Sequence, residues 1–369
     1  MSDERLKAKF INRTGASAPE LKLIDPVLIT KEELEAEMER LASLPVPANG
    51  RRMSVIAHPH TGVGDGLAPG TQVTISVLKP GERTKPIRHN SSQVNFCIRG
   101  GGHSVINGKR VVFRQYDVWN TPSMNIYEHV NDTKELQVRL AYSNAALLEK
   151  MNIHVVDDDP YGPKTVSEHR PAGGEGHGGN MENPFGTFQI TDEGAWLMPY
   201  EKLVNPDVVE WPVLHWPWEK VKANLDRLAG LGQEYRGRRL YLLYHPASGR
   251  LNGTSPTFFA TITLRPPKIV DRPHRHSSSA INYFFSGSGH SLVDGKRYHW
   301  KAGDLMLTAP GWAIHNHASN DEPVYELTIQ DSPLNISMDS LMWQEDLGRP
   351  FSMLGSQKGF ETNRAKLAG

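Results

Sequence analysis

The sequence predicts a mainly β protein made of two tandem copies of one unit, each a helix followed by a small β-barrel or sandwich. Short runs such as TQVTISVLKPG (71–81) and TFFATITLRPP (257–267) alternate apolar and polar residues, which is the period of a half-buried strand. The 33 glycines and 26 prolines separate these runs with turn signals. The third observation is an internal repeat.

The repeat has an offset of 187 residues, which becomes 188 after one inserted residue, Ala309. GRRMSVIAHPHTG (50–62) matches GRRLYLLYHPASG (237–249), and GGGHSVINGKR (100–110) matches GSGHSLVDGKR (287–297). Identity at one offset in several separate blocks is not a chance event, so the chain contains two copies of one structural unit.

A helix is expected at the start of each copy. TKEELEAEMERLAS (30–43) begins with the pair Thr30 and Glu33, which predicts a capping box. WPWEKVKANLDRLAGLG (216–232) carries Pro217 at its start and glycines at its end. Each helix precedes the β-rich part of its own copy.

Length and composition limit the class of protein. A chain of 369 residues is long for one core, and we expect an N-terminal barrel (1–155), a linker or arm (156–210) and a C-terminal barrel (211–369). Lys plus Arg equals Asp plus Glu at 41 each, so no nucleic-acid partner is indicated. No apolar run approaches the length of a membrane span.

Cysteine usage restricts the chemistry of any metal site. Cys97 is the single cysteine, while there are 16 histidines. A disulfide within the chain and a thiolate-based zinc site are therefore excluded. The charged start, MSDERLKAKF, lacks the apolar run of a signal peptide, and we expect a cytoplasmic protein.

The stretch PHRHSSSAINYFF (273–285) raises the question of a metal site. His274 and His276 are two residues apart, so on a strand both imidazoles project from one face. They either share a metal ion or lie on a solvated face. The repeat favours the metal, because one copy keeps the set and the other has lost part of it. We therefore expect the N-terminal barrel (1–155) to be metal-free and the C-terminal barrel (211–369) to be metal-binding. The second copy has His274, His276, His315 and His317, where the first has Ile87, His89, Tyr127 and His129.

The layout of HxH, the hairpin GSGHSLVDG and the segment GDLMLTAPGWAIHNH resembles the cupin family. The resemblance implies a bicupin: two tandem double-stranded β-helix (jelly-roll) barrels, each preceded by a helix. It implies a metal held by HxH and a later histidine, here His274, His276 and His315. The carboxylate that often follows HxH is missing, since 280–282 contains no acid. Three neutral ligands leave coordination positions open and suit Fe(II), Zn, Cu, Ni or Mn.

A narrower resemblance is carried by GRRLYLLYHP, HRHSSSAINYFFSGSG and GDLMLTAPGWAIHNHASNDEP. These segments resemble gentisate, salicylate and 1-hydroxy-2-naphthoate 1,2-dioxygenases. The resemblance implies a homotetrameric enzyme with Fe(II) that inserts both atoms of O2 between the carboxyl-bearing and hydroxyl-bearing carbons of an aromatic acid. It also implies that His317 hydrogen-bonds the substrate. In those relatives the intact metal motif lies in the first barrel, whereas here it lies in the second.

An aromatic acid needs a fixed cation and polar contacts for its carboxylate. The relatives carry an arginine where this chain has Asn282. Arg238 and Arg239 recur as Arg51 and Arg52, so a structural role competes with substrate binding for both. The candidate substrate-binding residues are Arg238, Arg239, Arg265, Asn282 and Trp312.

Two other functional classes stay open from the sequence. One is a different metal-dependent cupin enzyme, an isomerase or decarboxylase, and the other is a non-catalytic bicupin that binds a small molecule. The Gly- and Pro-rich segment 157–189 between the copies is read as an arm that packs on a neighbouring subunit, as a lid, or as a disordered linker.

Overall fold

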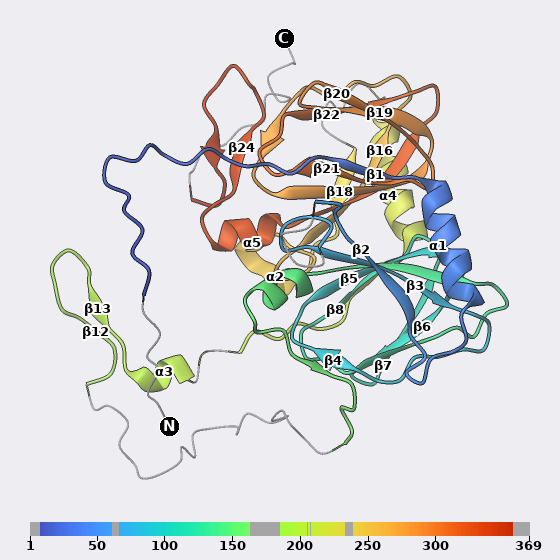
Figure 1. Cartoon of the computed structure of the whole chain (residues 1–369), viewed down its shortest axis with the longest axis horizontal. Coiled ribbons are helices and arrows are strands. Elements are labelled where there is room, and N and C mark those ends of the chain that lie inside the picture. The colour runs from blue at the N-terminus through green and yellow to red at the C-terminus, as the bar shows by residue number, and fades with distance from the viewer. Residues whose placement is uncertain are drawn as a thin grey trace.

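The computed structural model describes residues 8–60, 66–162, 185–204, 206, 208–232 and 239–356. Two β-barrels lie one against the other, the first copy in blue-green and the second in orange-red (Figure 1). This is the predicted pair of jelly-roll barrels, and the fold class is confirmed. Each barrel consists of a six-stranded sheet facing a three-stranded sheet.

The strands of the two barrels correspond through the repeat. The first barrel has the sheet β14 (His215–Trp216), β8 (Val118–Thr121), β5 (Gln93–Arg99), β10 (Gln137–Ser143), β3 (Gln72–Leu78) and β2 (Arg52–Ile56), facing β7 (Lys109–Arg114), β6 (Gly101–Ile106) and β9 (Tyr127–Val130). The second has β1 (Val27–Ile29), β21 (Leu305–Pro310), β18 (Ser279–Ser286), β23 (Val324–Gln330), β16 (Phe259–Arg265) and β15 (Leu240–Leu242), facing β20 (Lys296–Lys301), β19 (Ser288–Val293) and β22 (His315–Ser319).

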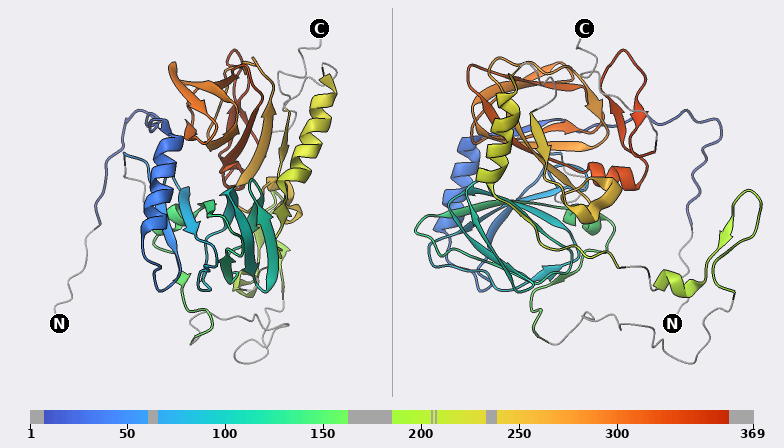
Figure 2. Two further views of the ribbon diagram at one scale, coloured as in Figure 1. Left: turned by 90° about the vertical axis from the view of Figure 1, so that its right-hand side faces the viewer. Right: turned by 180° about the vertical axis from the view of Figure 1, so that it is seen from behind.

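The two copies exchange an edge strand. Strand β1, from the first copy, pairs with β21 of the second barrel, with Leu28 opposite Met306. Strand β14, which precedes the helix of the second copy, pairs with β8 of the first barrel, with His215 opposite Trp119. The helices that follow, α1 (Lys31–Ser43) and α4 (Trp218–Gly230), flank the barrels on opposite sides (Figure 2). The exchange ties the two barrels into one body.

The main core lies between the two six-stranded sheets. In β18 the alternate residues Ile281 and Tyr283 belong to this shared core, and Phe96 of the first barrel lies 5.7 Å from Tyr283 between ring centroids. Phe284, the next residue along β18, points the other way and packs inside its own barrel. The period of two therefore sends one set of side chains to the barrel interface and the other into the barrel interior.

The helix at the start of the first copy has the predicted cap. The hydroxyl of Thr30 accepts the backbone N–H of Glu33, and the Glu33 carboxylate accepts the N–H of Thr30. Helix α1 then buries Leu34, Met38 and Leu41 in the shared core. No helix in the described ranges is long and apolar enough to cross a membrane.

The hairpin and short helix in the connection between the copies lie away from the barrels (Figure 1). The described part of this connection contains the hairpin β12 (Phe188–Gln189) and β13 (Trp196–Leu197) and the short helix α3 (Tyr200–Val204). The side chains of Phe185, Trp196 and Tyr200 are exposed. Most of the Gly- and Pro-rich segment read above as an arm or lid, residues 163–184, lies outside the described residues, and its role stays a prediction.

The remaining elements close the ends of the barrels. They are β4 (Arg88–His89), α2 (Ala145–Lys150), β11 (Val156–Asp157), the 3-10 turn Pro246–Leu251, β17 (Arg275–His276), α5 (Ser332–Ser337), β24 (Met342–Gln344) and β25 (Ser352–Met353). Strand β17 pairs with β24, and β4 pairs with β11. The HxH segment therefore lies beside β24, a strand from the C-terminal part of the chain.

Candidate metal centre

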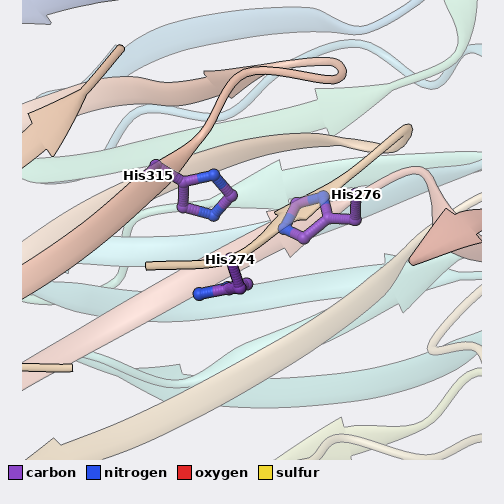
Figure 3. Close-up of side chains that lie close together, drawn as sticks. All are labelled: His274, His276 and His315. Atoms are coloured by element: carbon purple, nitrogen blue, oxygen red, sulfur yellow. The ribbon is translucent and has the colours of Figure 1, made fainter. Parts of the chain in front are cut away.

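Three histidines converge inside the second barrel (Figure 3). His274 and His315 face each other across an antiparallel bridge, with N–H···O distances of 3.1 and 2.9 Å. His276 follows on β17. The ligand-capable atoms of the three side chains all lie within 4.8 Å of one another, and all three residues are buried. In the described ranges this is the one group of three or more His, Cys, Asp or Glu with such spacing.

Backbone carbonyls orient all three rings in the same way. The Nδ1–H groups of His274, His276 and His315 donate to the carbonyl oxygens of residues 272, 278 and 313, at 3.1, 2.8 and 3.0 Å. A carbonyl can only accept, so each ring carries its proton on Nδ1 and its lone pair on Nε2. The scaffold thereby selects the neutral tautomer that a metal ion requires.

The equivalent place in the first barrel has the same backbone and different side chains. Ile87 pairs with Tyr127 across an antiparallel bridge, as His274 pairs with His315. The hydroxyl of Tyr127 lies 3.0 Å from Nε2 of His89, whose Nδ1–H donates to a carbonyl oxygen. That ring nitrogen of His89 accepts a hydrogen bond from the tyrosine.

His317, predicted as catalytic, lies on β22 two residues after His315, and their ring centroids are 5.9 Å apart. Its Nδ1 is 2.8 Å from the hydroxyl of Ser291, which accepts the indole N–H of Trp300 at 2.9 Å. The first barrel keeps the hydrogen bond between histidine and serine, with His129 Nδ1 at 2.7 Å from a serine hydroxyl. The position is therefore held rigidly in both barrels.

The candidate arginines have different surroundings. Arg238 lies outside the described residues. Arg239 donates from Nη2 to the carbonyl of Gly232, just after α4, at 3.1 Å. Arg265 is buried and forms two hydrogen bonds with Glu326, at 3.0 and 3.1 Å, and one with Asp271, at 3.2 Å. Burial alone would lower the pKa of Arg265, but these two carboxylates raise it well above its usual value.

The two acids beside Arg265 limit its ability to bind the carboxylate of a substrate. Because Glu326 and Asp271 already neutralise the Arg265 guanidinium, this arginine is poorly suited to hold a substrate carboxylate. It instead ties β16 to β23 inside the barrel. The sequence alone could not show this pairing, since the two acids lie on other segments of the chain.

The other two predicted substrate contacts, Asn282 and Trp312, lie in different parts of the second barrel. Asn282 points into the barrel interior, where its amide nitrogen donates to Thr328 at 2.9 Å and its oxygen accepts from Thr308. Trp312 lies at the rim. Its ring lies 4.5 Å from the Arg275 guanidinium carbon and 5.5 Å from the Phe351 ring centroid. Asn282 is thus on the histidine side of the barrel, and its amide is fixed by two threonines.

Sequence reasoning missed Trp343 on β24. Its indole stacks on His276 with ring centroids 4.9 Å apart and an interplanar angle of 22°, and it also lies 6.0 Å from His274. Its N–H donates to Glu345 at 3.2 Å. The pairing of β24 with β17 places His276 opposite Trp343. No motif or periodicity marks this tryptophan, because the pairing joins segments far apart in the sequence.

The donor set fits a divalent first-row metal. Three neutral imidazoles on buried strands offer nitrogen lone pairs and no counter-charge, which suits Fe(II), Zn, Ni or Cu rather than Mg or Ca. A three-protein-ligand arrangement also leaves positions for exogenous ligands, as in catalytic rather than structural sites.

Fold and site define a bicupin protein with one three-histidine cluster in its second barrel. Residues 260–329 match the cupin domain family. In structure the chain resembles salicylate 1,2-dioxygenase from Pseudaminobacter salicylatoxidans, with a TM-score of 0.70, 18% identity and 91% of each chain covered. That likeness establishes the fold.

The sequence relatives are 1,2-dioxygenases, which confirms the resemblance seen in the motifs. The chain is 27% identical over 266 residues to 5-aminosalicylate 1,2-dioxygenase of Comamonas sp., covering 70% of this chain and 64% of the relative. It is 23% identical over 337 residues to gentisate 1,2-dioxygenase of Haloferax sp., covering 88% and 87%. For the Comamonas protein and for 1-hydroxy-2-naphthoate dioxygenase of Nocardioides sp., the match spans under two thirds of the relative's length, at 64% and 62%.

Proposed function

We propose that the chain is an Fe(II)-dependent dioxygenase that cleaves the ring of a hydroxylated aromatic acid between the carboxyl-bearing and hydroxyl-bearing carbons. The observation that carries the proposal is the buried cluster of His274, His276 and His315, with all three rings held in the tautomer that presents Nε2. The names of the sequence relatives support the same reaction class.

The names of the relatives also suggest the substrate class. They refer to 5-aminosalicylate, 5-nitrosalicylic acid, gentisate and 1-hydroxy-2-naphthoate. All four compounds carry a hydroxyl group ortho to a carboxylate. We therefore propose a salicylate-type acid, in which these two groups form a bidentate chelate. Three neutral ligands leave the full charge of a divalent ion to attract that anion.

The roles of the chain's own residues follow from their contacts. His274, His276 and His315 would hold the ion, and bound Fe(II) would supply open positions for the acid and for O2 and transfer electron density between them. The hydroxyl of Ser291 accepts from Trp300 and can donate to Nδ1 of His317. Nε2–H of His317 would then be a donor to a substrate oxygen.

The rest of the binding pocket is also a proposal. Asn282 and Trp312 would contribute from the barrel interior and from the rim. Arg239 and Arg238 remain candidates for a carboxylate contact, whereas Arg265 is assigned to Glu326 and Asp271. A homotetramer and a cytoplasmic location stay predictions. The exposed apolar side chains of the arm, Phe185, Trp196 and Tyr200, support self-association through this segment.

The experiment that tests the function compares oxygen uptake with ring cleavage. The iron-loaded protein is mixed with salicylate, 5-substituted salicylates, gentisate and 1-hydroxy-2-naphthoate, with and without air, and followed by ultraviolet absorbance and an oxygen electrode. We expect one O2 consumed per substrate and no reaction without air. Turnover without oxygen would instead favour an isomerase or decarboxylase, and binding of the acid without turnover would favour a non-catalytic bicupin.

A further inference from the structure

We propose that the first barrel contains a binding site for a small planar oxyanion, such as formate or acetate, centred on Arg139. A partly open cavity of about 50 Å³ is lined by residues of this barrel. Its walls include Arg139 on β10, Arg51 just before β2, and Tyr127 and His129 on β9. It borders the place that corresponds to the histidine cluster of the second barrel, since Tyr127 is the counterpart of His315 and His129 is the counterpart of His317.

Among the residues that the structure describes, Arg139 is a buried charge that lacks a partner of opposite sign. The residue is 4% exposed, and its Nε donates to the amide oxygen of Gln137 at 3.0 Å. Within the ranges the structure describes, the two Nη groups have no hydrogen-bond acceptor and no carboxylate forms an ion pair with the guanidinium. Burial lowers the pKa of Arg139 to about 10, so the group remains charged at neutral pH.

A buried cation without a counter-ion is strongly unfavourable. The pair of Nη groups is the part of a guanidinium that binds a carboxylate through two parallel hydrogen bonds. Because Nε is already used by Gln137, the Nη edge is the one left to meet a ligand in the cavity. A planar oxyanion would satisfy both the charge and the hydrogen bonds.

The equivalent place in the second barrel carries acids that the first barrel does not have. Arg139 lies opposite Ser76 in the sheet, and Glu326 lies opposite Thr263 at the equivalent place. There, Glu326 and Asp271 neutralise Arg265. In the first barrel, the positively charged Arg139 occupies the position of Glu326. Two uncharged residues occupy the positions of Arg265 and Asp271. These two, Leu78 and Thr84, line the cavity.

The other groups around the cavity do not supply the missing negative charge. Burial lowers the pKa of Arg51, and the acid that acts on it is the exposed Asp158. Burial raises the pKa of Tyr127 and lowers the pKa of His129 well below its usual value. Both of these groups are therefore neutral at pH 7. The net charge at the cavity is positive, which favours an anion.

The size of the cavity selects the class of anion. A single water molecule needs a cavity volume of roughly 10–15 Å³, whereas an engineered cavity of about 150 Å³ binds benzene. At about 50 Å³, the cavity has room for a one- or two-carbon carboxylate, and its volume is well below that of a cavity that takes up a benzene ring. The site is thus distinct in ligand size from the proposed substrate site of the second barrel.

Thermal unfolding of the full chain tests the proposal. The midpoint is measured in sodium formate, acetate and chloride at equal ionic strength. A ligand that binds only the folded state raises the midpoint in proportion to the logarithm of its concentration above Kd. We expect formate or acetate to raise the midpoint above its value in chloride, and Arg139→Gln to abolish this difference. Equal midpoints in chloride and carboxylate for the wild type would overturn the proposal.

Arg52→Gln is the matched control. Arg52 lines the same cavity, but its guanidinium is paired with Glu82 at 2.5 Å. This variant should unfold at a lower temperature and keep the carboxylate-dependent rise. A rise that persists in Arg139→Gln would contradict the assignment.

If Arg139→Gln does not fold, a wild-type crystal grown without carboxylate and soaked in acetate locates the ion directly. Density for acetate against the Nη groups of Arg139 supports the site. Acetate found only elsewhere, or water alone in the cavity, overturns it.

Discussion

The indole ring of Trp343 lies almost parallel to the imidazole of His276, with ring centroids 4.9 Å apart and an interplanar angle of 22°. The pairing of β24 with β17 holds the two residues opposite each other. The tryptophan thereby covers one face of a candidate metal ligand and restricts the rotation of its ring. Residues that orient a ligand in this way contribute to metal affinity without touching the ion.

Replacement of Trp343 should therefore weaken the metal site. We expect Trp343→Ala to reduce metal affinity by about 10- to 100-fold, because His276 loses the surface that orients it, while Trp343→Phe keeps most of the affinity. Competition with a chromophoric chelator measures the change. Trp312→Ala is the control, since that ring stacks on Arg275 rather than on a histidine. Equal affinities for the wild type and Trp343→Ala would contradict a role in orienting His276.

His317 should affect turnover and not metal content. If Nε2–H of His317 donates to the substrate, His317→Ala lowers kcat by about a hundredfold or more, and the iron content per chain stays unchanged. Steady-state rates and elemental analysis on the same preparation separate the two effects. His290→Ala, on the neighbouring strand β19, should have wild-type rates. Loss of iron from His317→Ala would instead identify His317 as a ligand.

Asp331 gives a pH dependence of stability with a definite sign. Burial raises the pKa of its carboxyl to about 6, although the backbone N–H of Ser279 donates to it at 2.8 Å. The folded state therefore holds the proton more tightly than the unfolded state. The stabilisation is fully present below the unfolded pKa, near 4, and is lost as pH rises to about 6.

The Asp331→Asn variant cannot lose a proton there, so its stability relative to the wild type should increase across this interval. The shift in pKa corresponds to an increase of the order of 3 kcal/mol between pH 4 and pH 7. Urea unfolding of both proteins at a series of pH values measures it. Parallel stability curves would show that Asp331 has an ordinary pKa.

The two copies also cap each other's helices. The carboxylate of Asp304, in the second barrel, accepts the backbone N–H of Lys31 at the start of α1, at 2.7 Å. Asp117, in the first barrel, accepts the N–H of Trp218 at the start of α4, also at 2.7 Å. Each carboxylate meets the positive end of a helix dipole from the other copy.

Removal of one of these carboxylates should destabilise the whole chain. We expect Asp304→Ala to lower the free energy of unfolding by about 1–2 kcal/mol, and Asp304→Asn to lower it less, because an amide oxygen still caps the helix. Chemical denaturation measures both. Glu32→Ala, which removes an exposed ion pair with Lys301, should destabilise the chain much less than Asp304→Ala, because solvent screens an exposed pair. A cost for Asp304→Ala no larger than that of Glu32→Ala would contradict the cap.

The sequence was informative where a pattern repeats within the chain. The offset of 187 residues aligned Ile87 with His274 and Tyr127 with His315 once one insertion was allowed, and the structure pairs both couples across equivalent bridges. The period of two placed His274 and His276 on one strand end. The capping box at Thr30 was readable because all of its parts lie within one turn of helix.

The features that sequence did not reveal depend on contacts between distant segments. The exchanged strand β1 has three residues, too few for a periodic signal. Trp343 reaches His276 through a pairing that no local pattern announces. Arg265 was a reasonable candidate for a substrate contact until Glu326 and Asp271 were seen beside it. For Arg139 the reverse holds, because only the fold shows that none of the described acids pairs with it.

The metal content of three proteins tests the central claim most directly, namely a single metal centre in the second barrel. Wild type, His276→Ala and His89→Ala are loaded with Fe(II) without air, freed of excess metal and analysed for iron. His89 is the matched control, since it occupies the position of His276 in the first barrel. We predict one iron per chain for the wild type and for His89→Ala, and none for His276→Ala. Two irons per wild-type chain, or iron retained by His276→Ala, would contradict the account.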